Sequence, residues 1–290
     1  MASAEDWDGR EANAAIRVRT ITKSWDVGVV WALITWLLLP AAALSSYSAQ
    51  AVIFYSTADT NYNTTRPIGV LADSGWDSQG DWGAFLGAPI SPQHFITAKH
   101  LGGAVGGKFV LNGVEYTTAA FYDDPESDFR IWRIHGRFSS FAQLYPRPDE
   151  VGKNVFVFGR GTQRGSEVEV NGPLGSALKG WQWGPADGRK RWGQYQVGGV
   201  ASSNRGPSAA ASPPSQWTGD LLRVPFDADG GPNEAHLSSG DSGGGLFIRD
   251  GAVWKLAGIN FVVDGPYNSS DSGSGFQAAI FNEAGLYKGG

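Results

Sequence analysis

The chain has 290 residues, of which 41% are hydrophobic and 18% are charged, a composition typical of a globular protein rather than a disordered one. Its formal net charge of -5 lacks the basic excess that supports nucleic-acid binding, so no nucleic-acid partner is expected. The absence of cysteine excludes disulfides, thiolate metal sites and a cysteine nucleophile, and the four histidines are too scattered to indicate a zinc site. We therefore expect neither a metal nor a cofactor.

The amino-terminal segment, residues 1–51, has the pattern of an export signal. Basic residues precede an uncharged apolar run over 27–44, and a small-residue stretch then ends in Ala49 and Ala51, the A-x-A cleavage pattern. We expect cleavage after Ala51 and a secreted or periplasmic protein. A retained membrane anchor is the alternative, because the apolar run is close to the shortest that spans a bilayer, although Pro40 interrupts it.

Beyond the leader, short apolar or alternating segments recur, and many are bounded by Gly, Asp, Asn or Pro, which predicts an all-β fold. The polar, proline-containing stretch 136–152 divides them into an N-terminal β domain over 52–140 and a C-terminal β domain over 141–290. The stretch 180–217 has loop composition and is predicted to be a long insertion. Its basic triplet, 189–191, is interpreted as a solvated turn rather than a site for an anionic polymer.

The most informative motif is "GDSGG" at 240–244, which surrounds Ser242 with glycine. It satisfies G-x-S-x-G, the nucleophile elbow of α/β hydrolases, but that fold needs a histidine after the serine, and none follows Ser242. A catalytic base must therefore come from earlier in the chain, and the candidates are His94, His100, His135 and His236.

His100 is the strongest of these candidates, because it closes the strand-like run "ISPQHFITAKH", where a side chain reaches a cleft edge. Asp128 opens the strand-like run "DFRIWRI" and is the preferred acid, while Asp123 and Asp124 in the preceding turn have weaker context. The order His100, Asp128, Ser242 is that of the chymotrypsin-type triad.

The segments "FITAKH", "SDFRIWRI" and "GDSGGGLF" resemble the three signature segments of trypsin/chymotrypsin-like serine proteases, and the chain is similar to a disulfide-free member of bacterial type. The resemblance implies two six-stranded antiparallel β-barrels with the active site in the cleft between them. It assigns Ser242 as nucleophile, His100 as general base and acid, and Asp128 as the orienting carboxylate. The backbone N–H groups of Gly240 and Ser242 would form the oxyanion hole.

The chain departs from the family pattern at several positions. Lys99 replaces a small residue before the histidine, and its charge is expected to reach solvent. His236 stands where an acid would favour Arg or Lys substrates, so trypsin-type specificity is not implied. Asp241 resembles the acid that pairs with a freed amino terminus in zymogen-activated members, but the sequence at Val52 matches poorly, and that step is not expected here.

The predicted substrate pocket comprises His236 and a four-residue segment that resembles the substrate-pairing strand of the family. The residues of this segment are Asn260, Phe261, Val262 and Val263. That segment lacks the usual Ser-Trp-Gly.

We therefore predict an exported serine endopeptidase that acts on a protein or peptide through an acyl-enzyme, with a membrane contact only if the leader is retained. A catalytically inactive protease-like binding protein is the alternative, motivated by Lys99 and the altered substrate strand.

Overall fold

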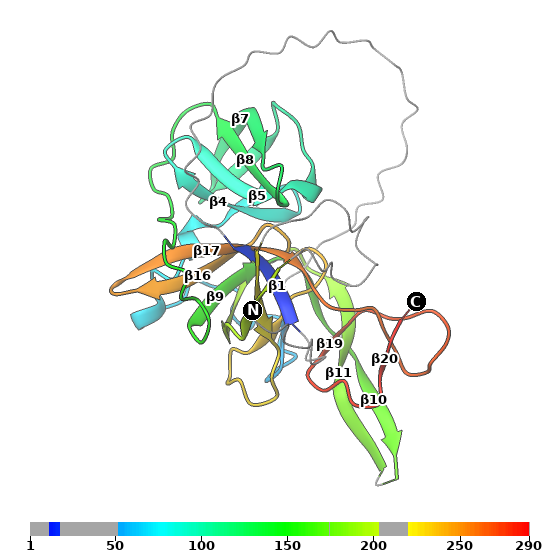
Figure 1. Ribbon diagram of the computed structural model, residues 1–290. Coiled ribbons are helices and arrows are strands. Elements are labelled where there is room, and N and C mark those ends of the chain that lie inside the picture. Colours follow the sequence, from blue (N-terminus) through cyan, green and yellow to red (C-terminus); the bar gives the residue numbers. More distant parts are fainter. Residues whose placement is uncertain (1–11, 18–51, 174, 203–219, 290) are drawn as a thin grey trace, which may run out of the picture.

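The computed structural model describes residues 12–17, 52–173, 175–202 and 220–289, and the regular structure of this part of the chain consists of β-strands and short 3₁₀ turns (Figure 1). The 3₁₀ turns are η1 (Gly69–Leu71), η2 (Trp76–Ser78) and η3 (Lys99–Leu101). The all-β class predicted from the sequence is thus confirmed.

The N-terminal half forms a closed six-stranded antiparallel barrel with the strand order β3-β4-β5-β8-β7-β6. Its strands are β3 (Gly80–Trp82), β4 (Phe85–Ser91), β5 (His94–Ala98), β6 (Lys108–Leu111), β7 (Val114–Asp123) and β8 (Phe129–Ile134). The β6–β7 hairpin turns at Asn112 and Gly113, whose φ values of 50° and 80° suit a two-residue turn of this kind. Aromatic side chains fill the interior, where the rings of Phe95 and Phe109 stack with centroids 3.9 Å apart.

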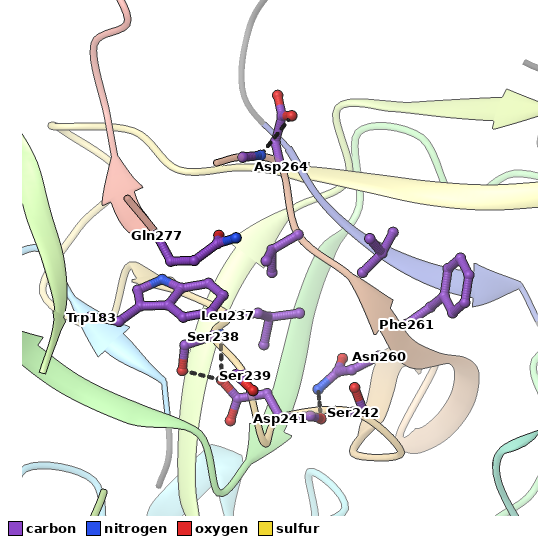
Figure 2. Close-up of a pocket in the computed structure, with 13 residues that line it drawn as sticks. Trp183, Leu237, Ser238, Ser239, Asp241, Ser242, Asn260, Phe261, Asp264 and Gln277 are labelled. Carbon is purple, nitrogen blue, oxygen red and sulfur yellow. Dashed lines mark hydrogen bonds between the residues drawn. The ribbon is translucent and has the colours of Figure 1, made fainter. Parts of the chain in front are cut away.

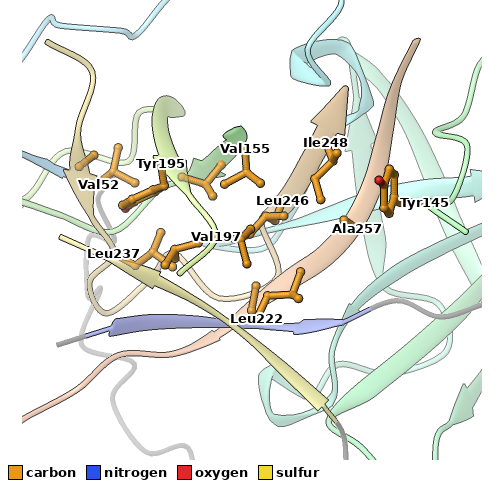
Figure 3. Packing of buried hydrophobic residues seen from close by; sticks show 14 of the residues in the cluster. Val52, Tyr145, Val155, Tyr195, Val197, Leu222, Leu237, Leu246, Ile248 and Ala257 are labelled. Carbon is orange, nitrogen blue, oxygen red and sulfur yellow. The ribbon is translucent and has the colours of Figure 1, made fainter. Parts of the chain in front are cut away.

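The C-terminal half is built on a seven-stranded sheet with the order β12-β9-β16-β17-β1-β14-β13. Its strands are β1 (Ala12–Arg17), β9 (Asn154–Gly159), β12 (Arg191–Gln196), β13 (Gly199–Ser202), β14 (Asp220–Pro225), β16 (Gly245–Asp250) and β17 (Val253–Val262). Buried side chains from several of these strands, among them Val155, Tyr195, Leu222 and Leu246, pack into one apolar cluster (Figure 3).

Three smaller sheets complete the described fold. A three-stranded sheet has the order β10-β11-β19, and two pairs are β15-β2 and β18-β20. The strands are β2 (Ile53–Phe54), β10 (Thr162–Gly172), β11 (Gly175–Ala186), β15 (Ala235–His236), β18 (Tyr267–Asn268), β19 (Ala278–Ile280) and β20 (Tyr287–Lys288). The β10–β11 hairpin extends away from the rest of the molecule (Figure 1).

The architecture is chymotrypsin-like, but the second unit differs from the six-stranded barrel that the resemblance implied. It is a seven-stranded sheet, and β1 from the segment assigned to the leader lies between β14 and β17. Arg17 at the end of β1 is 7% exposed and is bound by the carboxylate of Glu150, with Asp220 at 3.3 Å from the guanidinium. Burying this pair ties the amino-terminal segment to the C-terminal half.

The prediction of a long loop over 180–217 is wrong for the residues that the structure describes there. β11, β12 and β13 occupy this stretch, and Trp181 and Trp192 are buried in it. The basic triplet is a solvated turn only at Arg189, which is exposed: Arg191 is 2% exposed against Asp187, and the Lys190 ammonium donates to the carbonyls of Trp76 and Gln79. This stretch alternates glycine with large aromatic residues, and the glycine content is what made a buried set of strands look like a loop in the sequence.

The apolar run 27–44 lies outside the described residues. Within the residues that are described, no helix has the length and apolar character needed to cross a membrane.

Candidate active site

The His100–Asp128 pair forms where two neighbouring strands of the barrel meet η3. β5 and β8 are paired so that Ala98 lies opposite Phe129, which places the residues just beyond them side by side. Asp128 is 1% exposed, and its two carboxylate oxygens accept from the backbone N–H of His100, at 2.9 Å, and from the His100 Nδ1–H. The carboxylate therefore fixes the imidazole with its proton on Nδ1 and leaves Nε2 as the acceptor.

The other two acids considered from the sequence are occupied elsewhere. Asp123 forms a two-fold ion pair with Arg130, at 2.6 and 2.8 Å. Asp124 accepts from the hydroxyl of Ser127 and the backbone N–H of Glu126 within its own turn. Of the three acids, Asp128 is the one bonded to the His100 ring.

The loop that carries Ser242 is anchored by the buried side chain of Asp241, which is 1% exposed. Its carboxylate accepts from the backbone N–H groups of Gly161 and Ser238, each at 2.7 Å, and the backbone N–H of Val52 also donates to it. Burial raises the pKa of Asp241 to about 7, and the donated hydrogen bonds oppose that shift.

The bond from Val52 to Asp241 is made by a backbone N–H within the continuous chain and not by a freed amino terminus. β2 pairs with β15 in the register Ile53 to His236, and this pairing delivers the backbone of Val52 to the loop. A poor match of side chains at Val52 had hidden a contact that the backbone makes.

Close packing requires a glycine at position 243, directly after Ser242. A Cβ on Gly243, whose φ is +80°, would lie 2.3 Å from the Leu86 carbonyl oxygen and 2.4 Å from the Thr97 hydroxyl, with the Leu101 side chain at 2.9 Å. The serine loop therefore lies directly against β4, β5 and the 3₁₀ turn that carries His100. This contact brings the two halves of the site together.

Backbone N–H groups around Ser242 divide into two sets. Those of Asp241, Gly243 and Gly244 donate to carbonyl oxygens of Ser238, Asn260 and Asp241, respectively. Those of Gly240 and Ser242 have no acceptor among the described residues, and Gly240 has a φ of +100°, which favours glycine. Two unpaired N–H groups flanking one residue are the arrangement that stabilises an oxyanion.

Phe261 is a shared neighbour of His100 and of the pocket that Ser242 lines. Its ring is 6.0 Å from the His100 ring. In the described part of the chain, no hydrogen bond joins the Ser242 hydroxyl to the imidazole. Such bonds are often long without substrate and tighten when it binds.

Next to Ser242 the surface opens into a pocket of about 230 Å³ (Figure 2). It contains four of the five residues predicted for the substrate pocket, Asn260, Phe261, Val262 and Val263. The remaining lining residues are Trp183, Leu237, Ser238, Ser239, Asp241, Ser242, Asp264, Gly265 and Gln277.

Both carboxylates of the pocket are occupied by donors. Asp264 accepts from Lys288 at 2.7 Å and from the N–H of Gly265 at 2.9 Å, and Asp241 is occupied as described above. The apolar part of the pocket lining comes from Leu237, Val262, Val263 and Trp183, and its uncharged polar part includes Ser238, Ser239, Asn260 and Gln277. The pocket thus offers no unpaired charge to a bound side chain.

His236, predicted to line the pocket, does not do so. It is fully buried, its Nδ1 contacts the carbonyl of Leu237, and its ring packs edge-on against Phe226. Burial lowers the pKa of the imidazole to about 4. The β15–β2 pairing turns this side chain into the core, so the position at which the family places an acid is inside the protein here.

Trp183 and Gln277 were not found by sequence reasoning. Trp183 lies on β11 and Gln277 just before β19, and the backbone N–H of Trp183 donates to the Gln277 carbonyl at 3.0 Å. Neither residue belongs to a motif. Ser238 and Ser239, by contrast, directly precede the serine motif, and that proximity could have indicated them.

The fold is an all-β, chymotrypsin-like architecture with a closed six-stranded barrel and a second, seven-stranded sheet. It is similar to the crystal structure of the Rv3671c protease in an inactive form, with 16% sequence identity and a TM-score of 0.42, over 69% of this chain and 90% of that one. A mutant of Rv3671c from M. tuberculosis H37Rv, a serine-to-alanine variant also in an inactive form, gives 14% identity and a TM-score of 0.41, over 71% and 89%.

No protein-family model and no curated protein matches the chain. At such low identity the activity of the two structures is not transferred, and the chemistry is inferred from this chain's own residues.

Proposed function

We propose that this chain is a serine endopeptidase that hydrolyses peptide bonds through Ser242, His100 and Asp128. The observation that carries the proposal is the pair of unpaired N–H groups, of Gly240 and Ser242, together with an imidazole whose tautomer Asp128 fixes. A nucleophile, a base in the correct tautomer and an oxyanion site are the parts that acyl transfer requires.

In the proposed reaction, the Ser242 hydroxyl attacks the scissile carbonyl carbon while His100 Nε2 takes its proton. The carbonyl oxygen becomes an oxyanion and accepts from the N–H groups of Gly240 and Ser242, each worth about 3 kcal/mol. When the tetrahedral intermediate collapses, the C–N bond breaks and the leaving amine takes the proton from Nε2. Water, activated by the same nitrogen, then hydrolyses the ester and frees Ser242.

The pocket supports a preference for an uncharged residue on the acyl side of the scissile bond. Its lining combines apolar side chains with uncharged polar ones, and the carboxylates of Asp241 and Asp264 already have donors. A lysine or arginine side chain would be desolvated there without a free counter-charge. We expect peptides with leucine or phenylalanine at this position to be cleaved at least about tenfold faster than those with lysine or glutamate, the difference that 1.4 kcal/mol produces.

The proposal includes export with a cut after Ala51, on the strength of the A-x-A pattern, although β1 in the segment before the cut is paired within the C-terminal sheet. Sequencing the amino terminus of protein recovered from the host's exterior or periplasm tests it. A start at Val52 supports removal, and a retained apolar run contradicts it.

A protease-like binding protein is the second candidate, favoured by the missing hydrogen bond between Ser242 and His100. A fluorophosphonate probe separates the two, because it labels only an activated serine. We expect one label per folded wild-type chain, on Ser242, and none on Ser242→Ala with an unchanged melting temperature. If folded wild-type protein takes up no label, the endopeptidase proposal is wrong.

A further inference from the structure

Lys99 directs its charge inward instead of reaching solvent as the sequence suggested. Its ammonium donates to the backbone carbonyls of Asp124 and Ser127, each at 3.0 Å. The Lys99 backbone N–H donates to the carbonyl of Asp128 at 2.6 Å. Lys99 thus binds the main chain at Asp128 itself and at two residues that precede it.

The segment that Lys99 binds is a turn that is closed on itself. Asp124 accepts from the Ser127 hydroxyl at 2.6 Å, and its backbone N–H donates to the Phe129 carbonyl at 3.0 Å. These bonds fix the shape of the turn but do not attach it to η3. Attachment comes from Lys99 and from the bonds between Asp128 and His100.

We propose that Lys99 is a positioning residue that holds the Asp128 carboxylate in register with the His100 imidazole by binding the 124–127 turn through its ammonium. An ammonium suits this task because it carries three donors and can bond two carbonyls at once. Without it, the turn keeps its internal bonds but loses one of its anchors to η3. Asp128 is then displaced relative to the ring. The inference rests on the proposed function for its catalytic consequence, while its structural part stands alone.

The test replaces Lys99 by Met, which keeps the apolar stem and removes the ammonium. A misplacement of about 1 Å costs about a hundredfold in rate, so we expect kcat to fall by up to about that factor with KM little changed. We also expect the low-field proton resonance of His100 Nδ1–H to move upfield or broaden, because it reports the bond to Asp128 directly. Lys99→Gln, which keeps an uncharged NH₂ donor group, should fall between Lys99→Met and wild type.

The matched control is Lys108→Met, because Lys108 is a barrel lysine whose side chain is 71% exposed and pairs with Glu115 at the surface. It should leave both the rate and the resonance unchanged. A Lys99 variant that folds and keeps the wild-type resonance overturns the positioning role, whatever its activity. If Lys99→Met does not fold, Lys99→Gln decides by the same resonance.

The resonance also separates the two proposals. A wild-type chain that shows it but takes up no fluorophosphonate label refutes the endopeptidase, and the resonance of Lys99→Met then decides the role of Lys99: a shifted or broadened signal supports it and an unchanged one overturns it. A wild-type chain that lacks it refutes the bond that Lys99 is proposed to maintain.

Discussion

Replacing Asp128 by Asn tests the proposed chemistry with almost no change in shape. Both oxygens of Asp128 accept, one from the backbone N–H of His100 and one from its Nδ1–H. An asparagine has one acceptor and one donor at the same positions. Since the backbone N–H cannot give up its proton, the asparagine oxygen must stay with it, and the NH₂ group then faces Nδ1.

Facing a donor, the imidazole shifts its proton to Nε2 and loses the lone pair that accepts from Ser242. A wrong tautomer of this kind lowers the rate of a serine protease by about 10⁴-fold, or about 5 kcal/mol. We expect that loss in kcat/KM for peptide hydrolysis and in the rate of fluorophosphonate labelling. Circular dichroism and the melting temperature should stay near wild type.

Asp123→Asn is the matched control, because Asp123 binds Arg130 and not the ring, and it should retain activity within a few-fold. An Asp128→Asn enzyme that hydrolyses peptide within tenfold of wild type would refute the assignment of the acid. Equal losses in the two variants would mean that the turn, and not the tautomer, matters.

Three further outcomes follow from buried groups. Arg17→Met leaves the Glu150 carboxylate buried without its guanidinium, and denaturant unfolding should show a loss of about 3–5 kcal/mol. Gly244→Ala would place a Cβ 1.9 Å from the Phe158 carbonyl oxygen, so it should lower the free energy of unfolding by about 1–3 kcal/mol or more. The same variant should lose fluorophosphonate labelling. Burial raises the pKa of Asp241 to about 7, whereas its pKa in the unfolded chain is near 3.8, so the folded state binds the proton more tightly. The free energy of unfolding should therefore fall as pH rises from about 4 to 7. Asp241→Asn should remove about 4 kcal/mol of that pH dependence, measured by urea unfolding at a series of pH values. A flat difference between wild type and Asp241→Asn across this range would contradict the last expectation.

The parts of the site that lie in linear motifs were predictable from the sequence. Ser242 sits among glycines that close packing demands, and His100 and Asp128 flank strands whose alternation is visible in one dimension. His100 follows β5 and Asp128 directly precedes β8, and these two strands are neighbours in the barrel.

Other parts depend on pairings that local sequence does not encode. His236 faces the core because β15 pairs with β2, and in a strand a one-residue change of register reverses the face of every side chain. Trp183 and Gln277 reach the pocket through the β11–β19 sheet, whose strands are far apart in the chain. Lys99 was expected at the surface because nothing local shows that two carbonyls from another segment lie within its reach.

β1 makes the amino-terminal segment a structural part of the C-terminal sheet. A cut between Arg17 and Val52 would leave the C-terminal sheet shared by two polypeptides, joined by the pairing of β1 with β14 and β17 and by the buried bond from Arg17 to Glu150. The processed protein would then be a non-covalent heterodimer of unequal fragments. Should the shorter fragment depart, two neighbouring strand edges would be bared along the middle of the sheet, a surface prone to recruit any extended chain it meets.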